Sequence, residues 1–236
     1  MKKAAKAPRS PVAQGPAASE RDAGGARSAV SSKGQATRAR IVGVATGLFA
    51  QAGYEATSIE TVLAQSGVSR GALYHHFEDK QALFVAVLEA IEASIAQATV
   101  VASRGIADPV EALLAGCNAW LDVSRDPAVR QIVLMDAPAV IGWQKWREID
   151  ARYGFGLLKG SLKAAAGAGR LRPELVEVFA HVLLAAVLEI ALLMARAHDP
   201  AKAAREGRAA LRELIDKLLG PASKARPRRK AAGARA

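Results

Sequence analysis

The stretch TSIETVLAQSGVSRGALYHHF, residues 57–77, decides the fold of the N-terminal part of this 236-residue chain. Thr57 or Ser58 can cap the first turn of a short helix. Gly67 can end that helix, because glycine accepts the left-handed backbone that closes many helices. Ser69 can then cap a second short helix. Two short helices joined by a turn that contains glycine form a helix-turn-helix.

The second helix, residues 69–76, has an apolar inner side and a polar outer side that suits a polyanion. On the outer side, Arg70 has the forked head that can read guanine through two hydrogen bonds. Gly71 has no side chain, so a rigid backbone can approach it closely. Donors to phosphate oxygens are available on Thr57, Ser58, Tyr74 and His75. Many positioning contacts beside few reading contacts are typical of a DNA interface.

These residues do not fit a metal site or a catalytic centre. His75 and His76 are neighbours on a helix and point about 100° apart, and no third ligand is spaced nearby. HExxH is absent. Sequence order alone leaves a nucleophile–His–acid triad open, but no serine sits on a strand-to-helix elbow of the G-x-S-x-G type. The sequence GFGLLKGS at 154–161 lacks both the spacing of a phosphate loop and a preceding strand. We therefore expect no enzyme activity, no metal and no cofactor.

Helical periodicity continues on both sides of this stretch. Residues 36–52 carry apolar side chains at i, i+3, i+4 and i+7, and Gly53 supplies the end of that helix. A further helix is predicted from Glu78 or Asp79 through Ile91. Later helices are predicted over residues 109–124, 126–136, 142–166, 173–197 and 200–219. No region alternates like a half-buried strand, so the predicted fold is all-α.

Positive charge is concentrated at the two ends of the chain. Residues 1–35 hold seven Lys/Arg against two acids, residues 220–236 hold six and no acid, and residues 36–219 balance at twenty against twenty. Both ends are rich in Ala, Pro, Gly and Ser and lack aromatics, so disordered basic tails are predicted. Such tails either only add solubility, or attract the phosphate backbone without sequence preference.

The composition also bears on the compartment. A single cysteine, Cys117, allows no disulfide within the chain and is consistent with a reducing cytoplasm. The N-terminal lysines are followed by no apolar run, so a secretory signal is not predicted. The most apolar segment, residues 175–195, carries Glu177, His181 and Glu189, which favours a buried helix over a membrane span.

Residues 37–89 resemble the DNA-binding domain of TetR-family transcriptional regulators. The matching pieces are GY-x-x-TS-I, A-x-x-GVS-x-G-x-LY-x-HF, and K-x-x-L at the start of the fourth helix. The resemblance implies a helix-turn-helix domain over residues 36–90 and a helical effector-binding and dimerisation domain over residues 91–219. It also implies a homodimer whose recognition helices enter successive major grooves of a palindromic operator. By position, it implies phosphate contacts for Thr57, Ser58, Tyr74, His75 and Lys80, and places at or near base edges for Ser69, Arg70 and Gly71.

The predicted helix at 173–197 is apolar on nearly every side, so part of it should meet another surface. Together with the helix at 200–219 it predicts a four-helix packing across a two-fold axis, as the resemblance also implies. The residues expected there are Phe179, Val182, Ala186, Ile190, Leu211, Leu214, Ile215 and Leu218. The alternative is a deeper core within one subunit.

Large apolar side chains gather between residues 117 and 156. An apolar effector pocket is predicted from Cys117, Trp120, Met135, Trp143, Trp146 and Tyr153, with Phe155 beside them. The alternative is that these side chains fill the core between helices. Cys117 is not favoured as a redox sensor, because no basic group lies near it in sequence.

These features predict a homodimeric repressor that a small apolar effector of unknown identity releases from double-stranded operator DNA. The alternative function is a non-specific architectural DNA-binding protein that depends on its basic tails. No membrane partner is expected.

Overall fold

The computed structural model describes residues 21–220, and it describes side chains from residue 33 onward. Most of the two predicted basic tails, residues 1–35 and 220–236, therefore lies outside the described residues. By its packing the chain divides into two units, residues 1–39 and 40–236. The described part of the first unit is the beginning of helix α1. The contacts reported below lie within the second unit.

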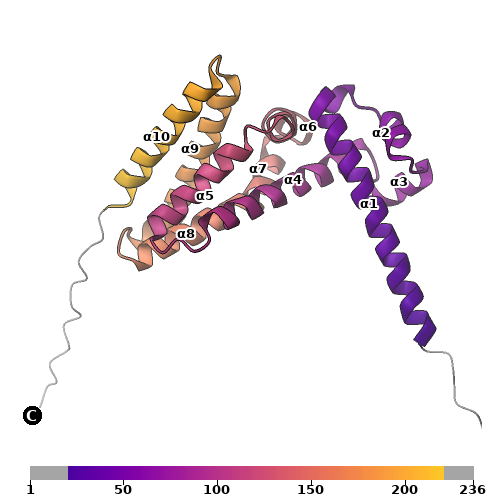
Figure 1. The fold of residues 1–236 in the computed structure, drawn as a ribbon, viewed down its shortest axis with the longest axis horizontal. Helices are drawn as coiled ribbons and strands as arrows, with labels where there is room; N and C mark the ends of the chain where they lie inside the picture. The colour runs from indigo at the N-terminus through magenta and orange to yellow at the C-terminus, as the bar shows by residue number, and fades with distance from the viewer. Residues whose placement is uncertain (1–20, 221–236) are drawn as a thin grey trace, which may run out of the picture. The chain divides into compact units, whose positions relative to one another are not determined.

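Between residues 21 and 220 the chain is built from helices without a strand, which confirms the predicted all-α class (Figure 1). The N-terminal helices are α1 (Arg21–Ala56), α2 (Ile59–Ser66), α3 (Arg70–His76) and α4 (Lys80–Ser103). They are followed by α5 (Pro109–Val123), the π-helical segment η1 (Val129–Asp136), α6 (Ala137–Ile141), α7 (Trp143–Asp150), the π-helical segment η2 (Ala151–Phe155), α8 (Gly156–Gly167), the 3-10 turn η3 (Pro173–Leu175), α9 (Val176–Arg196) and α10 (Pro200–Leu218).

Helix α1 begins earlier than the sequence predicted and ends where it predicted. Its start at Arg21 precedes the predicted start at residue 36, and residues 21–35 contain no proline that would forbid a helix. At the other end Gly53 has φ 78° and ψ 171°, which interrupts the helical backbone. A residue without Cβ adopts that conformation most readily, so the predicted stop at Gly53 is confirmed.

Short polar side chains fix where five helices begin. Oxygens of Ser58, Ser69, Asp79, Asp108 and Asp199 accept backbone N–H bonds in the first turns of α2, α3, α4, α5 and α10, at 2.7–3.2 Å. These bonds satisfy amide groups that have no partner within the helix. The caps predicted at Ser58 and Ser69 are thus confirmed, and these bonds fix where α2 and α3 begin.

A cluster of aromatic rings joins the end of α1 to the beginning of α4. Phe49 and Phe84 are fully buried, with ring centroids 5.3 Å apart in an edge-to-face arrangement. Tyr54 completes the cluster at 5.8 Å from Phe49 and 5.1 Å from Phe84. Edge-to-face pairs at these distances add stabilisation beyond the area that they bury. The cluster therefore holds the end of α1 against the beginning of α4, the two helices between which α2 and α3 lie in the sequence.

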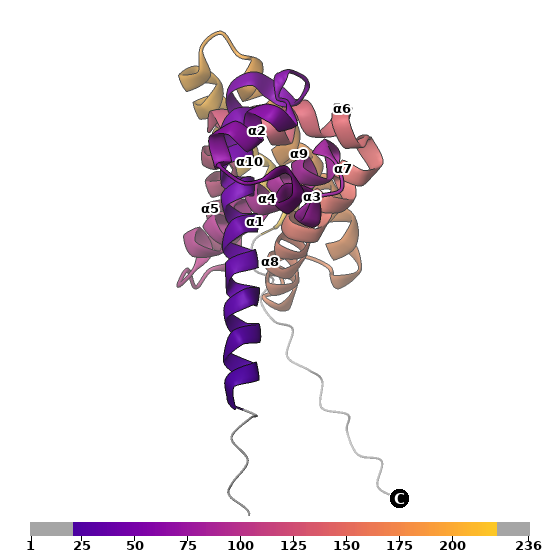
Figure 2. The same cartoon turned by 90° about the vertical axis from the view of Figure 1, so that its right-hand side faces the viewer.

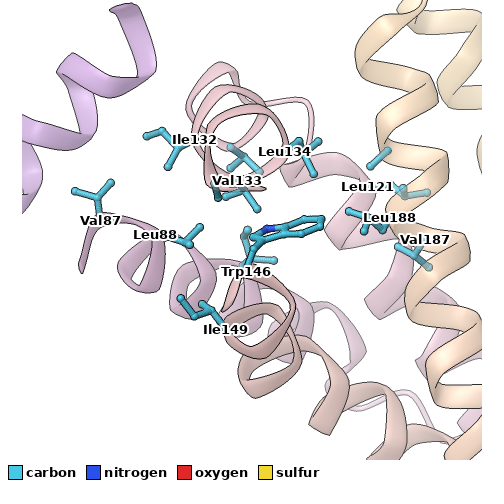
Figure 3. Packing of buried hydrophobic residues seen from close by; sticks show 14 of the residues in the cluster. Val87, Leu88, Leu121, Ile132, Val133, Leu134, Trp146, Ile149, Val187 and Leu188 are labelled. Atoms are coloured by element: carbon cyan, nitrogen blue, oxygen red, sulfur yellow. The ribbon is translucent and has the colours of Figure 1, made fainter. Parts of the chain in front are cut away.

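The C-terminal part is a helical bundle in which α4 packs along α5, and α9 packs against α8 and α10 (Figure 1). Trp146 of α7 is 1% exposed, and Figure 3 shows its indole among Leu88, Val133 and Leu188. The predicted helix at 142–166 is present as α7, η2 and α8 in sequence. Its middle is π-helical, a wider turn that often lies beside functional sites.

Two segments, Lys80–Ser103 and Pro173–Arg196, are long and apolar enough to cross a membrane by length and composition alone. Both contribute buried side chains to the bundle, among them Leu88, Ile95 and Leu183. Packing against other helices therefore accounts for part of their apolar character.

The contact between α9 and α10 leaves no room for a side chain at Gly207. A Cβ atom there would lie 2.6 Å from Cγ2 of Ile190, a β-branched side chain with little freedom to move. Gly207→Ala should therefore lower the free energy of unfolding by about 1–3 kcal/mol, the usual cost of overpacking. Unfolding in urea measures this change in free energy.

Gly160→Ala in α8 is the matched control, because nothing lies within 4 Å of its Cβ. The control should gain up to about 1 kcal/mol from helix propensity, and equal effects at both sites would contradict the prediction.

Candidate nucleic-acid interface and buried cavity

Helix α3 turns one side into the core and leaves the other open. Leu73 is 0% exposed and Phe77 is 4% exposed, so these two side chains anchor the helix from beneath. The opposite side carries exposed residues, which are Ser69, Arg70, Gly71, Tyr74 and His75. Figure 2 views the molecule from the side of α2 and α3. Five of the residues predicted for DNA contact thus share one accessible surface.

Arg70 is held by an acid of the preceding helix. Its Nη2 lies 2.8 Å from Oε1 of Glu60 on α2, and both side chains are mostly exposed. A backbone hydrogen bond lowers the pKa of Glu60, and the hydrogen bond from Arg70 is the next largest cause of that shift. Exposed ion pairs contribute little to stability, so Arg70 can exchange Glu60 for a base or phosphate at small cost.

Two residues predicted to contact phosphate are instead engaged at the end of α1. Thr57 is 2% exposed, and its hydroxyl donates to the carbonyl of Gly53 at 2.8 Å. Lys80 Nζ donates to the carbonyls of Tyr54 and Thr57 at 2.9 and 3.1 Å and lies 4.0 Å from the centre of the Tyr54 ring. Both side chains satisfy carbonyl groups at the helix end. Ser58, by contrast, is exposed at the start of α2.

The same helix end is bonded to the C-terminal bundle. The N–H of Tyr54 donates to Oδ2 of Asp136 at 2.8 Å, and Gln131 holds Oδ1 of that carboxylate at 2.9 Å. A second bond runs from Nε2 of Gln81 on α4 to the carbonyl of Val140 on α6, at 2.7 Å. A Cβ on Gly53 would lie 3.4 Å from Gln131. We call this set of contacts the Gly53 junction.

A cavity of about 90 Å³ lies inside the bundle, between α4, α5, α7, η2, α8 and α9. We call it the bundle cavity. It is several times larger than the roughly 10–15 Å³ that one water molecule needs. Its walls are mainly apolar, with Ile95, Leu113, Leu158, Leu184 and Leu188 among them. Space of this kind between bundle helices is where small-molecule sites commonly occur.

The structure brings three of the six predicted pocket residues to the bundle cavity. They are Cys117, Trp120 and Tyr153. The other three lie elsewhere, since Met135 and Trp143 are 48% and 62% exposed and Trp146 is packed in the core. The six residues were predicted as one group because they lie close together in sequence. The direction in which α7 and η1 present their side chains turns three of them away from the cavity.

Two carboxylic acids that the sequence prediction missed line the bundle cavity. Glu92 on α4 is 3% exposed and Asp150 on α7 is 6% exposed. Burial raises the pKa of Glu92 to about 8, with the charge of Asp150 adding to it. Burial likewise raises the pKa of Asp150 to about 6, while Arg147 opposes that change. A signal was present in the sequence, because Glu92 follows Leu88 by four residues and precedes Ile95 by three, on the apolar face of a helix.

Cys117 is a buried free thiol in the cavity wall. Burial raises its pKa to about 12. The reactive form of cysteine is the thiolate, which is therefore scarce at neutral pH. This environment agrees with the sequence argument against a redox sensor.

An apolar stripe on α9 is exposed. Val178, Val182 and Leu193 are 56%, 42% and 60% exposed, and their spacing places them on one side of the helix. Of these three, only Val182 was predicted for a dimer interface. The other predicted interface residues include five that are half-buried, namely Phe179, Ala186, Ile190, Leu214 and Leu218. Leu211 and Ile215 are 0% exposed within the subunit, because they form the face with which α10 packs on α9.

An all-helical chain with a capped helix-turn-helix and a separate ligand-sized cavity defines a class of proteins, the DNA-binding transcriptional regulators. Two family models assign the chain within that class. "Bacterial regulatory proteins, tetR family" matches residues 41–87, and "Tetracyclin repressor-like, C-terminal domain" matches residues 110–218. The chain belongs to the TetR family, whose members are transcription factors and not enzymes.

Individual relatives agree with this assignment. The chain is 43% identical over 63 residues to the HTH-type transcriptional regulator AcrR of Shigella flexneri, covering 27% of this chain and 29% of AcrR. It is 38% identical over 78 residues to the HTH-type transcriptional repressor AcnR of Corynebacterium diphtheriae, covering 33% and 40%. Each match thus spans less than half of the relative's length. A TetR-family regulator from Pectobacterium atrosepticum has a similar structure, with a TM-score of 0.70, 29% identity, and coverage of 81% of this chain and 98% of that one.

The buried acid gives a prediction for stability against pH. Folded Glu92 has a pKa of about 8 against the ordinary 4.5, so the folded state binds the extra proton between those values. The free energy of unfolding should therefore fall as pH rises, by about 2 kcal/mol between pH 6 and 8. Glu92→Gln, which cannot titrate, should lack this loss. Urea unfolding of both proteins across that range measures the difference, and parallel curves would contradict it.

Proposed function

We propose that this chain is a homodimeric repressor that binds a palindromic operator through α3 and is released when a small molecule occupies the bundle cavity. The observation that carries the DNA-binding part is the outer side of α3. There Arg70, Tyr74 and His75 are accessible on a helix that Ser69 caps and Leu73 anchors. The repressor named AcnR, which is similar over part of its length, supports the direction of regulation. Because the proposed operator is chromosomal DNA, we also place the protein in the cytoplasm as part of this proposal.

The exposed residues divide into positioning and reading roles. Ser58, Tyr74 and His75 carry donors at accessible positions, and we assign them to phosphate oxygens. Arg70 has the length and the fork to contact guanine in the major groove, and Gly71 lets the backbone approach. We assign Thr57 a structural role at the end of α1, because its hydroxyl already donates to the carbonyl of Gly53. Lys80 retains one N–H beyond its two carbonyl bonds, which leaves it able to reach a phosphate.

Dimerisation is assigned to the outer stripe of α9. Val178, Val182 and Leu193 expose apolar surface along one side, a pattern that marks an interaction site. A two-fold axis through this stripe would bring α9 and α10 of two copies together in the predicted four-helix packing. By helical spacing, Phe179, Ala186 and Ile190 border the stripe on α9. We assign the half-buried Leu214 and Leu218 of α10 to the same interface, whereas Leu211 and Ile215 are buried within the subunit.

Release would follow from the position of α4, which takes part in both sites. Its first residue, Lys80, is bonded to the end of α1, and Glu92 in the cavity wall lies about 18 Å further along the helix. The two recognition helices must lie roughly 34–36 Å apart to enter successive major grooves. A ligand that binds more tightly to a conformation with a different spacing would lower operator affinity.

Selection of bound duplexes from random DNA tests sequence reading, with the expectation of an inverted repeat. On the selected operator, Arg70→Ala should cost about 1–3 kcal/mol and relax specificity at one base pair per half-site. Arg152→Ala is the matched control, because Arg152 is 61% exposed and pairs with Glu89 at 2.8 Å, much as Arg70 pairs with Glu60. Selected duplexes without an inverted repeat would favour the architectural alternative. If Arg70→Ala lowers the affinity for all DNA sequences equally, Arg70 contacts a phosphate and not a base.

The α9 stripe gives a second prediction. Val182→Glu places a charge where two copies would meet, so light scattering should show monomers and operator affinity should fall by at least about tenfold. Val101→Glu is the control, since Val101 is 55% exposed on α4 and takes no part in the stripe. The control protein should remain dimeric. A dimer that survives Val182→Glu would exclude this stripe as the interface.

A further inference from the structure

Glu92 is a buried acid without a complete set of partners. Its side chain is 3% exposed, and its Oε1 atom has no hydrogen-bond partner although no solvent reaches it. A buried oxygen left in this state costs free energy unless a partner arrives. The side chain lines the bundle cavity, so a molecule in the cavity can supply that partner. An ionised carboxylate only accepts hydrogen bonds, so the partner that ionised Glu92 lacks is a hydrogen-bond donor.

The other groups that face the bundle cavity favour a positive charge. Asp150 from the end of α7 adds a second carboxyl, one oxygen of which accepts a bond from Arg147 at 3.1 Å. Trp120 of α5 and Tyr153 of η2 add aromatic rings, whose faces attract cations. The thiol of Cys117 and the hydroxyls of Thr99, Ser103 and Ser161 are neutral. Of the described residues that line the cavity, none is Lys, Arg or His.

We propose that the bundle cavity binds a small lipophilic amine in its protonated form, with its N–H groups donating to Glu92 and its apolar body against the leucine-rich walls. This inference names the ligand class of the site in the proposed function. It rests on that proposed function only for the claim that a ligand in the bundle cavity releases the operator. It replaces the purely apolar effector that the sequence indicated. The ammonium group satisfies Oε1 of Glu92 and offsets the negative charge of the two acids. An anion would meet two carboxyls with no cation of the cavity wall beside it.

The pH dependence of binding separates an ionic contact from simple filling of space. Glu92 must lose its proton to pair with an ammonium group, and burial keeps that proton bound near neutral pH. Asp150 with its partner Arg147, Cys117 and Tyr153 are the other titratable or charged groups at the site. Because Asp150 titrates lower, Glu92 governs the range from pH 6 to 8. Affinity for an amine should therefore rise with pH across that range, by up to about tenfold per unit.

Three probes of nearly one shape test the charge, namely benzylamine, benzyl alcohol and benzoate. Calorimetry on the full chain without DNA should show benzylamine binding at least about tenfold tighter than benzyl alcohol, with benzoate weakest, as expected for a hydrogen bond to a charged group. Glu92→Gln should weaken benzylamine binding by about tenfold or more, abolish its pH dependence, and leave benzyl alcohol nearly unchanged. The matched control is Glu89→Gln, the same change one turn earlier on α4, at a side chain that pairs with Arg152 at the surface. The control should bind all three probes as the original chain does.

Several outcomes would overturn the amine site. They are equal binding of benzylamine and benzyl alcohol, preference for benzoate, binding of benzylamine that is independent of pH, no binding of any probe, and unchanged affinity in Glu92→Gln. Should Glu92→Gln fail to fold, the probe series and the pH series on the original chain still decide the question. Operator release is measured separately by adding benzylamine to the DNA complex. Binding without release would leave the amine site standing and would remove the effector part of the proposed function.

Discussion

The end of α1 is the constraint on which both halves of the molecule depend. At Gly53 the backbone leaves the helix with φ 78°, and the carbonyls that this exposes are taken up by the Thr57 hydroxyl and the Lys80 ammonium group. The first free amide beyond it, at Tyr54, is taken up by Asp136 from the bundle. A side chain at residue 53 would strain the backbone, because φ is positive there. One residue without a side chain thus lets three elements meet with their polar groups satisfied.

This arrangement makes α4 a mechanical link in the proposed regulator. Lys80 ties its first turn to α1, whereas Glu92, three turns later, lies in the wall of the bundle cavity. Gln81 adds a bond from the first turn to the carbonyl of Val140 on α6. A helix transmits displacement along its axis because its hydrogen bonds keep it stiff over a few turns. A ligand that moves the middle of α4 would therefore act on the bonds by which Lys80 joins α4 to the end of α1.

Local signals explain which parts of the structure could be predicted from sequence. Ser58, Ser69 and Gly53 act within one turn of the chain, so their effects are visible in neighbouring letters. Predictions that depended on which way a long helix faces fared less well, as Trp143 at the surface and Trp146 in the core illustrate. Their orientation follows from the packing of α7, and the π-helical turns of η1 and η2 shift the phase that a regular helix would have. The orientation of the Thr57 side chain was also not predictable from sequence. Only the folded structure shows that its hydroxyl is buried and donates to the carbonyl of Gly53.

Glu92 shows why a residue that opposes stability is informative. An apolar side chain at the same place on α4 would extend the stripe of Leu88 and Ile95 and avoid the cost of burying a carboxyl. Sequences that fold well agree with local rules at most positions, and departures from those rules concentrate where function requires them. Here the departure points to a kind of ligand, because a carboxyl with one unpartnered oxygen belongs to a side chain in the wall of the bundle cavity, beside a second acid and two aromatic rings. Burying the carboxyl of Glu92 destabilises the fold, and a bound protonated amine would relieve that cost by pairing with it. The selectivity for a positive charge would therefore follow from the unfavourable burial of Glu92.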